Sequence, residues 1–267
     1  MRYDRMLENK NVLITGGASG IGKECALLFA SHGAVVAISD IDGEKGAALL
    51  EQLKEYNQEC GFFPADLSRD AAKACDWYLD KYKAPDIWLN TAGAYRPAFI
   101  DEMPEADLDY MLSLNLVMPF LVMQRLAPSM KEKGGSVIQF SSEFGAIKGH
   151  LGVSGYAATK GGLYAMTNAF AMEYAPYGIR ANSINPGVGV GFMGDLADEE
   201  MVKRNGAACW ERVTPFPRRA ENIEAANLAL FLASDMSKHI TGEGIYLDGG
   251  QHVISHNNGH NIRRDWR

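Results

Sequence analysis

Tyr156 and Lys160 are the side chains of this sequence whose types and spacing most directly suggest chemistry. They lie four positions apart in residues 153–174, an expected helix, so they share one face and point towards a common region. An ammonium group near a phenol favours the phenolate, so we expect Lys160 to lower the pKa of Tyr156 from about 10 towards neutrality. Such a phenol can donate or accept a proton at an alcohol or carbonyl oxygen. The spacing is common by chance, and an interfacial tyrosine beside a solvated lysine has the same pattern.

A glycine-rich loop, Thr-Gly-Gly-Ala-Ser-Gly-Ile-Gly, occupies residues 15–22 between the expected first strand and first helix. Glycines at such a junction permit a tight turn and let backbone N–H groups approach a pyrophosphate at the helix N-terminus. We interpret the loop as a dinucleotide-binding site in preference to a purely structural turn. The residues expected to contact the cofactor here are Gly16, Ser19, Gly20, Ile21 and Gly22.

The same stretch contains the pattern G-x-x-x-x-G-K, from Gly17 to Lys23, which is typical of nucleotide hydrolases. Those proteins need a Ser or Thr hydroxyl at the next position as a ligand for magnesium. The next residue here is Glu24, whose carboxylate would crowd and repel the phosphates. We therefore set the nucleotide hydrolase interpretation aside.

Asp40 closes the expected second strand, 18 residues after Gly22. An acidic side chain there can accept hydrogen bonds from the adenosine ribose hydroxyls, and it would repel a 2′-phosphate. Neither Ser19 in the loop nor Ile41 after Asp40 supplies a cation for that phosphate. NAD (NADH) is therefore expected in preference to NADP; the alternative is a solvated aspartate at a strand end.

The elements that must hold these groups alternate between short apolar strands and amphipathic helices. Uniformly apolar strands separated by helices indicate a parallel sheet covered on both faces. We predict an α/β protein: a single-domain Rossmann fold with a doubly wound seven-stranded parallel sheet and helices on both faces. The expected strands are 12–14, 34–39, a short one near Phe62, 87–89, 137–140, 181–184 and 244–247, and the expected helices are 21–31, 44–56, 71–82, 107–133, 153–174 and 221–232.

Composition agrees with a globular chain and excludes several classes of protein. Of the 267 residues, 47% are hydrophobic and 22% are charged, which argues against disorder. The net charge of -7 argues against general attraction to nucleic acid or anionic lipid. We see no run of about 18 apolar residues that would span a membrane and no signal peptide in residues 1–10. We expect a cytoplasmic protein of one domain, residues 1–267, with a core at about 10–250, a tail at 251–267, and no nucleic-acid or membrane partner.

Further motifs give Tyr156 and Lys160 a context. In chain order they are the loop at 15–22, Asp66 in Ala-Asp-Leu, Asn-Thr-Ala-Gly at 90–93, Asn115, Ser-Glu-Phe-Gly at 142–145, Tyr-Ala-Ala-Thr-Lys at 156–160, Gly-Ile-Arg-Ala-Asn-Ser-Ile-Asn-Pro-Gly at 178–187 and Asp-Gly-Gly at 248–250. Together, from Lys10 to Gly250, they resemble the short-chain dehydrogenase/reductase family. Their co-occurrence in this order is highly specific.

The resemblance implies a role for each of four residues. Tyr156 would be the general acid or base, and Lys160 would lower its pKa and hold the nicotinamide ribose. Ser142 would hydrogen-bond the reacting oxygen, and Asn115 would hold a water of a proton relay. Hydride would pass between the nicotinamide and a carbinol carbon. The alternative for Ser142 is an ordinary hydroxyl at a strand end.

The resemblance also extends the cofactor site beyond the glycine loop. Asp66 would contact the adenine, unless it merely caps a helix, and Asn90 would steady the sheet beside the cofactor. The further positions implied as cofactor contacts are Asp40, Asp66, Leu67, Asn90, Ala92, Gly93, Tyr156, Lys160, Pro186, Gly187 and Val188.

Asn115 has a physical argument of its own. Pro119 lies four residues later and has no N–H, so the Asn115 carbonyl loses its normal helical partner. A freed carbonyl on a kinked helix can bind the water that the relay requires. The alternative is that Pro119 only bends the helix and a neighbouring side chain satisfies the carbonyl.

Two features depart from the family pattern. The threonine that commonly follows the Pro-Gly turn is missing, because Pro186 and Gly187 lead to Val-Gly-Val-Gly; backbone would then supply this contact, and residues 187–219 suggest a mobile lid. Thirteen residues separate Ser142 from Tyr156, about one more than is usual in the family. The longer loop lies on the substrate side.

The substrate is suggested only by the residues expected around the pocket. Those expected to contact it are Ser142, Tyr156, Arg96, Glu143, His150 and Phe192. Three hydrogen-bonding side chains among them favour a polar substrate, and residues 156–180 are similar to bacterial sugar dehydrogenases. We expect a sugar, polyol or related hydroxy acid. The same side chains could face water on the rim, and an acyl-chain ketone or a steroid stays open.

The expected partners are a small-molecule substrate and further copies of the chain. Helices 107–133 and 153–174 are apolar beyond one face, and the family resemblance implies a homotetramer or homodimer. His252, His256 and His260 recur every four residues in the tail, but the Asn and Gly residues around them disfavour a helix. We therefore expect no metal site and interpret the tail as solvated or as a subunit contact.

Two classes of function remain open at this point. An oxidoreductase would lose hydride transfer if Tyr156 became Phe. A sensor or scaffold could use the same fold to bind the dinucleotide without turnover, since fold alone does not decide function. The presence of all four catalytic residues favours the enzyme.

Overall fold

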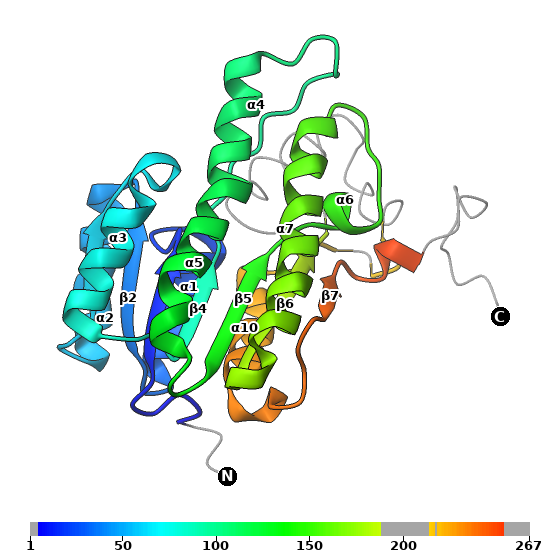
Figure 1. Cartoon of the computed structure of the whole chain (residues 1–267). Coiled ribbons are helices and arrows are strands. Elements are labelled where there is room, and N and C mark those ends of the chain that lie inside the picture. Colours follow the sequence, from blue (N-terminus) through cyan, green and yellow to red (C-terminus); the bar gives the residue numbers. More distant parts are fainter. Residues whose placement is uncertain (1–4, 188–213, 217, 254–267) are drawn as a thin grey trace.

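The computed structural model describes residues 5–187, 214–216 and 218–253 of the chain, and its centre is a seven-stranded parallel sheet (Figure 1). The spatial order is β3-β2-β1-β4-β5-β6-β7, so the chain runs outward in two directions from β1 and β4. The strands are β1 (Asn11–Thr15), β2 (Val35–Asp40), β3 (Gly61–Pro64), β4 (Ile87–Asn90), β5 (Gly135–Phe140), β6 (Ile179–Pro186) and β7 (Gly244–Leu247). The doubly wound α/β fold predicted from the sequence is confirmed.

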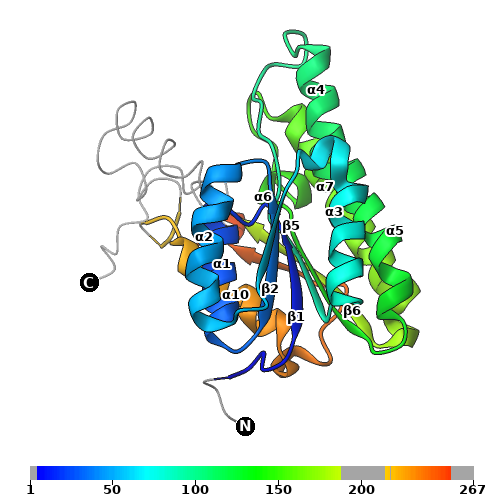
Figure 2. The ribbon, with the colours of Figure 1, turned by 90° about the vertical axis from the view of Figure 1, so that its left-hand side faces the viewer.

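Helices cover both faces of the sheet, as Figure 2 shows edge-on. One layer contains α1 (Gly20–Ser31), α2 (Gly43–Tyr56) and α10 (Asn222–Ala233), and the other contains α3 (Leu67–Tyr82), α5 (Met118–Met130) and α7 (Ser154–Tyr174). The shorter helical segments are α4 (Glu105–Leu112), the π-helix η1 (Ser113–Val117), α6 (Glu143–Ala146), and the 3-10 turns η2 (Ala175–Tyr177), η3 (Asp235–Ser237) and η4 (Gln251–Val253).

The core has two halves because strand side chains alternate between the faces of the sheet. Leu13 and Trp88 are fully buried towards α3 and α5, whereas Val12 and Ile14 face α1 and α10. Burying apolar side chains on both faces contributes about 25 cal/mol for each Å² removed from water. This burial explains why the central strands are apolar at nearly every position.

The expected helix over residues 107–133 is in fact three segments. It begins as α4, widens into the π-helix η1, and continues as α5 to Met130. The N–H of Met118 bonds to the carbonyl of Ser113, five residues back, and Pro119 follows immediately. Because proline cannot donate a hydrogen bond, the backbone inserts one wider turn before it. The predicted irregularity at Asn115 is therefore present, as a π-helical turn.

The run Glu105–Met130 is also long and apolar enough to cross a membrane, judged by length and composition alone. The run was not expected from the sequence, because charged and polar residues interrupt its apolar ones. In the structure this run packs against α3 and α7, and Met111, Met118, Val122 and Leu126 belong to the core. The apolar side chains of Glu105–Met130 are therefore explained by packing within the core of the protein.

Most other boundaries agree with the prediction within a few residues. The third helix starts earlier than expected, at Leu67, because the Asp66 side chain accepts a hydrogen bond from the Ser68 N–H and caps it. The four-residue helix α6 was not predicted, since it has no room for a periodic apolar pattern. The segment 187–219, expected to be irregular, lies mostly outside the described residues.

Candidate active site

Tyr156 and Lys160 both lie in the first turns of α7, at the carboxyl end of the sheet. The Lys160 amino group is buried, donates a 2.7 Å hydrogen bond to the carbonyl of Phe140 at the end of β5, and lies 5.9 Å from the centre of the Tyr156 ring. Ser142 lies close enough to the Tyr156 hydroxyl to lower the pKa of that phenol. The structure therefore brings together the three residues predicted to act on the reacting oxygen.

The expected direction of the tyrosine shift is wrong for this structure. Burial raises the pKa of Tyr156 to about 12, although the side chain of Ser142 lowers it, and the charge of Tyr95 raises it further. Burial also lowers the pKa of Lys160 to about 8, because the ammonium group has left water for the protein interior. The Lys160 amino group is directed at the carbonyl oxygen of Phe140 and not at the phenol. The loss of water around Tyr156 therefore affects the pKa of the phenol more than attraction to the lysine charge does.

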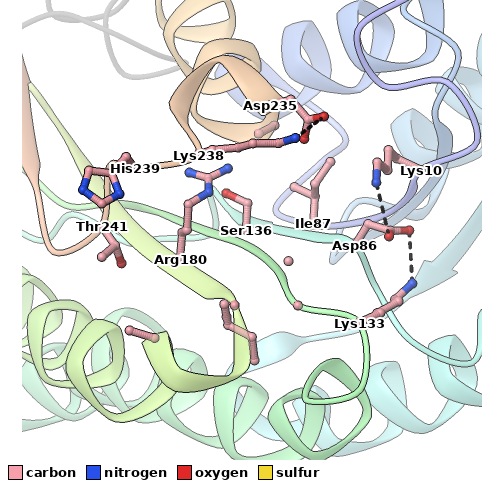
Figure 3. Close-up of a pocket in the computed structure, with 16 residues that line it drawn as sticks. Lys10, Asp86, Ile87, Lys133, Ser136, Arg180, Asp235, Lys238, His239 and Thr241 are labelled. Carbon is pink, nitrogen blue, oxygen red and sulfur yellow. Dashed lines mark ion pairs between the residues drawn. The ribbon is translucent and has the colours of Figure 1, made fainter.

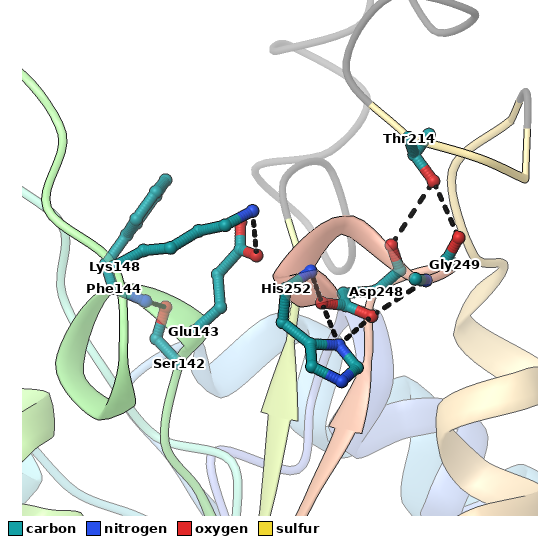
Figure 4. Close-up of polar contacts among 9 residues, drawn as sticks. Ser142, Glu143, Phe144, Lys148, Thr214, Asp248, Gly249 and His252 are labelled. Carbon is teal, nitrogen blue, oxygen red and sulfur yellow. Dashed lines mark hydrogen bonds and ion pairs between the residues drawn. The ribbon is translucent and has the colours of Figure 1, made fainter. Parts of the chain in front are cut away.

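Ser142 is positioned by an unusually close contact between α6 and α7. Its hydroxyl accepts a 3.2 Å hydrogen bond from the N–H of Phe144 and begins α6 (Figure 4). A methyl group on Gly145 would lie only 2.7 Å from the Cβ of Lys160, and one on Gly161 would lie 2.9 Å from the Gly145 carbonyl oxygen. Two glycines facing each other thus let α6 approach α7 closely enough for Ser142 to reach Tyr156.

Asn115 joins the π-helical turn to both neighbouring segments of the site. Its side-chain oxygen accepts a hydrogen bond from the Ala94 N–H, and its amide nitrogen donates to the Ala94 carbonyl and to the Thr159 hydroxyl. Thr159 in turn donates to the carbonyl of Tyr156. Asn115 is completely buried and fixes the distance between the end of β4 and α7. Its role in a water relay stays a prediction.

The glycine-rich loop has the geometry of a phosphate cradle. Gly16 has a positive φ of 79°, and a side chain there would collide with the backbone of Thr91 and Ala92. A methyl group on Gly22 would strike the Gly16 carbonyl, so α1 starts directly against the loop. The Ser19 side chain makes no capping hydrogen bond in the described structure, so the first N–H groups of α1 have no partner from that side chain. These residues fit a dinucleotide pyrophosphate.

Asp40 closes β2 beside this loop, as predicted. One carboxylate oxygen accepts a 2.9 Å hydrogen bond from the Ala18 N–H, and the other accepts a 3.0 Å hydrogen bond from the Asp42 N–H. The negative charge is thus fixed at the side of the loop where Ser19 and Gly20 begin the helix. This position suits the recognition of ribose hydroxyls.

Other expected cofactor positions lie along the same edge of the sheet. Asp66 caps α3 and bonds both the N–H and the hydroxyl of Ser68, so the helix-capping alternative describes its present contacts. Leu67 and Ala92 are buried, Gly93 is exposed, and Pro186 and Gly187 end β6. Val188 lies outside the described residues.

Asn90 links three strands next to the loop. Its side-chain oxygen accepts from the Thr15 hydroxyl and the Ala92 N–H, and its nitrogen donates to Gln139 on β5. Asn90 thus connects β1, β4 and β5, and its place beside a cofactor stays a prediction. At Gly93 a methyl group would lie 3.3 Å from the Lys160 amino nitrogen and 3.4 Å from the Asn115 oxygen, so this position borders the catalytic residues directly.

Two of the side chains expected to make a polar substrate pocket are exposed and have contacts within the chain. Arg96 is exposed, pairs with Asp107 at 3.8 Å and lies over the ring of Tyr110. His150 is also exposed, with its Nδ1 atom 3.0 Å from the Leu151 carbonyl. Phe192 lies outside the described residues.

Glu143, the remaining member of that set, is fully buried beside Ser142. Its carboxylate accepts a 3.2 Å hydrogen bond from Lys148, which lies in the loop after α6 (Figure 4). Its charge also helps to raise the pKa of Tyr246 on β7, after burial and the charges of Tyr164 and Asp248. Glu143 therefore supports α6 from inside and does not present its carboxylate to solvent.

Two features of the site escaped the sequence analysis. The Tyr95 ring meets the Tyr156 ring edge-on at 5.1 Å, a contact that requires knowing how the loop after β4 folds back. Asp248, buried after β7, accepts hydrogen bonds from the Gly250 and His252 N–H groups and pairs with the His252 ring at 2.8 Å (Figure 4). The Asp-Gly-Gly motif at 248–250 is visible in the sequence, but the sequence does not show that the Asp248 carboxylate binds several groups at once.

The part of the chain that the structure describes contains no group of three or more His, Cys, Asp or Glu residues that could hold a metal ion. His252 is paired with Asp248 and stacks on the Tyr246 ring at 4.5 Å. His256 and His260 lie outside the described residues. Cys25, Cys60 and Cys75 are buried free thiols.

Comparison with known proteins gives this site a family. A family model described as Enoyl-(Acyl carrier protein) reductase matches residues 16–252. The chain belongs to the short-chain dehydrogenase/reductase family. It is thus an oxidoreductase of the kind that uses a nicotinamide cofactor and acts on an alcohol or ketone of small size.

Relatives of this family match the chain over nearly its full length. The 3-oxoacyl-[acyl-carrier-protein] reductase FabG of Thermotoga maritima is 36% identical over 247 residues, covering 91% of this chain and 98% of that protein. The trans-4-hydroxycyclohexanecarboxylate dehydrogenase of Sinomonas cyclohexanicum is 33% identical, covering 98% of each. A solved structure of a short-chain dehydrogenase/reductase from Serratia marcescens superimposes with a TM-score of 0.84 at 27% identity, over 92% of this chain and 99% of that one.

The contact between α6 and α7 predicts a large effect for a small substitution. In Gly145→Ala, the added methyl group would force α6 away from Lys160 and Gly161, and Ser142 would move with it. We expect the variant to lose about 1–3 kcal/mol of unfolding free energy, measured by urea denaturation. Gly149→Ala is the matched control: Gly149 lies four residues later, in the loop after α6, with no atom within 4 Å of the added methyl group, and its stability should be unchanged. Equal stability of both variants would contradict this packing.

Proposed function

We propose that this protein is an NAD(H)-dependent oxidoreductase that interconverts a secondary alcohol and a ketone. The observation that carries the proposal is the convergence of Ser142, Tyr156 and Lys160 at one end of the sheet, next to the glycine loop. Asn115 is fixed to the same helix through Thr159.

The residues of the site divide the work of the reaction. When bound, a nicotinamide cofactor supplies or accepts the hydride. Ser142 holds the substrate oxygen, and Tyr156 moves the proton at that oxygen. With its raised pKa the Tyr156 phenol is protonated at neutral pH, which is the form that ketone reduction needs. Oxidation of an alcohol needs the phenolate, so positive charge near Tyr156 has to lower its pKa first.

NAD is proposed over NADP because of Asp40. Its carboxylate is held at the rim of the glycine loop by the Ala18 and Asp42 N–H groups, where it can accept hydrogen bonds from ribose hydroxyls. A 2′-phosphate at the same position would meet a fixed negative charge. Gly16, Gly20 and Gly22 would hold the pyrophosphate through the backbone, as their close contacts allow.

For the substrate, the site supports a compound with an apolar body better than a sugar. The two loops beside Tyr156 expose Phe99, Ile100, Ile147 and Leu151, and they are joined by a hydrogen bond from the Ala98 N–H to the Gly152 carbonyl. The sugar or polyol expected from Arg96, Glu143 and His150 loses the support of Glu143, because that carboxylate is buried and paired with Lys148. An acyl or alicyclic ketone also agrees with the names of the two relatives above.

We also propose that the enzyme is cytoplasmic and works as a homodimer or homotetramer. Val117, Phe120 and Leu121 in η1 and α5, and Met172 in α7, expose apolar side chains on the outer helical layer. Apolar groups at this density on long helices are typical of subunit contacts. Sedimentation of the full chain would give the number of copies.

The reaction is tested with a substrate panel read by NADH absorbance. The panel contains 3-oxoacyl thioesters, alicyclic hydroxy acids, steroids, sugars and polyols, each offered in both directions. We expect turnover of an acyl or alicyclic member, and a loss of about 10²–10⁴-fold in kcat for Tyr156→Phe, which removes only the hydroxyl. Tyr110→Phe, a similar change over Arg96, is the control.

The outcomes separate the competing functions. Turnover of sugars alone would overturn the proposed substrate class while leaving the reaction intact. Full activity in Tyr156→Phe would contradict the catalytic role. NADH binding without turnover of any panel member would favour a non-catalytic sensor or scaffold.

Cofactor choice is tested at Asp40. The kcat/KM for NAD should exceed that for NADP by at least about tenfold in the natural protein, and Asp40→Ala should reduce the ratio by about tenfold through the loss of ribose contacts and of repulsion. Asp101→Ala, which removes an exposed carboxylate in a distant turn, should leave the ratio unchanged. A preference for NADP in the natural protein would refute the argument from Asp40.

A further inference from the structure

A cavity of about 610 Å³ lies at the amino ends of β4, β5 and β6, where Ile87, Ser136 and Ile179 form part of its wall (Figure 3). Its volume is typical of sites for small molecules, which range over roughly 300–1,000 Å³. In parallel sheets the catalytic ligands bind at the carboxyl ends of the strands. This cavity is at the opposite end from Ser142 and Tyr156, so the proposed reaction does not use it.

The charge of the cavity lining has the opposite sign to that of the chain. The whole sequence has 33 acidic and 26 basic residues. The charged or titratable side chains of the lining are Lys10, Lys133, Arg180, Lys238 and His239 on one side of the balance, and Asp86 and Asp235 on the other. Even when the histidine is neutral and is not counted, the cationic side chains of the lining outnumber its carboxylates. A concave surface of one sign concentrates ligands of the other sign.

Arg180 is the fixed cation of the cavity. Its guanidinium group donates hydrogen bonds to the carbonyl oxygens of Leu232 (2.8 Å), Ser234 (3.3 Å) and Ile240 (3.4 Å), which end α10 and the loop after it. Within the described residues Arg180 forms no ion pair, although the negative charge of Asp235 is near enough to raise its pKa. Burial lowers the pKa of Arg180, and the charge of Asp235 opposes this shift.

The lysines around Arg180 retain spare positive charge. Lys10 and Lys133 share the single carboxylate of Asp86, at 3.8 and 3.1 Å, so one negative charge serves two ammonium groups. Lys238 pairs with Asp235 at 3.0 Å, but 70% of the lysine and 64% of the aspartate side chain is exposed. Exposed pairs of this kind are weak, so the Lys238 ammonium is available to a stronger partner.

We propose that this cavity binds a small polyanion, one that carries phosphate groups or several carboxylates, through Arg180, Lys238 and Lys133. An oxyanion placed there would give Arg180 the counter-charge that three neutral carbonyls do not supply. The cavity is larger than a single phosphate needs, which favours an organic phosphate or a polycarboxylate over a monovalent ion. Figure 3 shows the Arg180 and Lys238 side chains extending over the same hollow.

Calorimetric titration of the full chain tests the proposal, with pyrophosphate and citrate as probes and sodium chloride at matched ionic strength as the reference. We expect one equivalent of at least one probe to bind above the chloride reference, and Lys238→Gln to weaken that binding by about fivefold. Lys73→Gln is the matched control, since Lys73 forms a similar exposed pair with Asp70 at 2.7 Å on α3, and it should bind as the natural protein does.

Pyrophosphate could also enter the glycine loop, so each titration is repeated with excess NADH. Binding that persists with NADH and weakens in Lys238→Gln supports the cavity, and the tighter probe shows whether phosphate or carboxylate is preferred. The proposal is overturned if neither probe binds above chloride, if NADH abolishes the binding, or if Lys238→Gln and Lys73→Gln bind equally well.

Discussion

The buried amino group of Lys160 is the feature on which the rest of the site depends. It is 5% exposed and bonded to the last carbonyl of β5, so the start of α7 cannot move relative to the sheet without leaving a buried charge unpaired. Leaving a buried donor without its acceptor costs about 1–3 kcal/mol, and more when the donor is charged. Tyr156, one turn earlier, is held in place by the same constraint, and Gly145 and Gly161 let α6 bring Ser142 to it. The packing of α6 and α7 against the end of β5 therefore also sets the positions of the catalytic side chains.

The two ends of the sheet have different chemistry because of how a parallel sheet is built. All seven strands point the same way, so their carboxyl ends gather the glycine loop, Asp40 and the catalytic group at one edge. The amino ends gather the connections from helices back to strands; in this chain those connections carry Lys133 and Lys238, and Arg180 lies at the start of β6 beside them. A protein with a net negative charge can thus contain a basic cavity, because the charge of the cavity depends only on the residues that line it.

Much of this could be predicted from sequence, and the failures have physical causes. The order of strands and helices followed from apolar runs and glycines, and the pairing of Tyr156 with Lys160 followed from helical spacing. The direction of the Tyr156 pKa did not, because it depends on burial, which sequence spacing does not reveal. Arg96 and His150 were placed in the pocket by their loops, yet the loops fold so that both side chains face outward. Long-range contacts such as Tyr95 on Tyr156 have no local signal.

The central claim is that burial, more than the charge of Lys160, sets the state of Tyr156 in the free protein. Carbon-13 labelling of the tyrosine Cζ atoms, with Tyr156→Phe to assign the signal, measures this phenol directly during a pH titration by NMR. The account predicts that Tyr156 stays protonated through pH 10 and titrates at about 12. A midpoint at or below its ordinary value of about 10 would contradict the account, because the lysine would then dominate over desolvation.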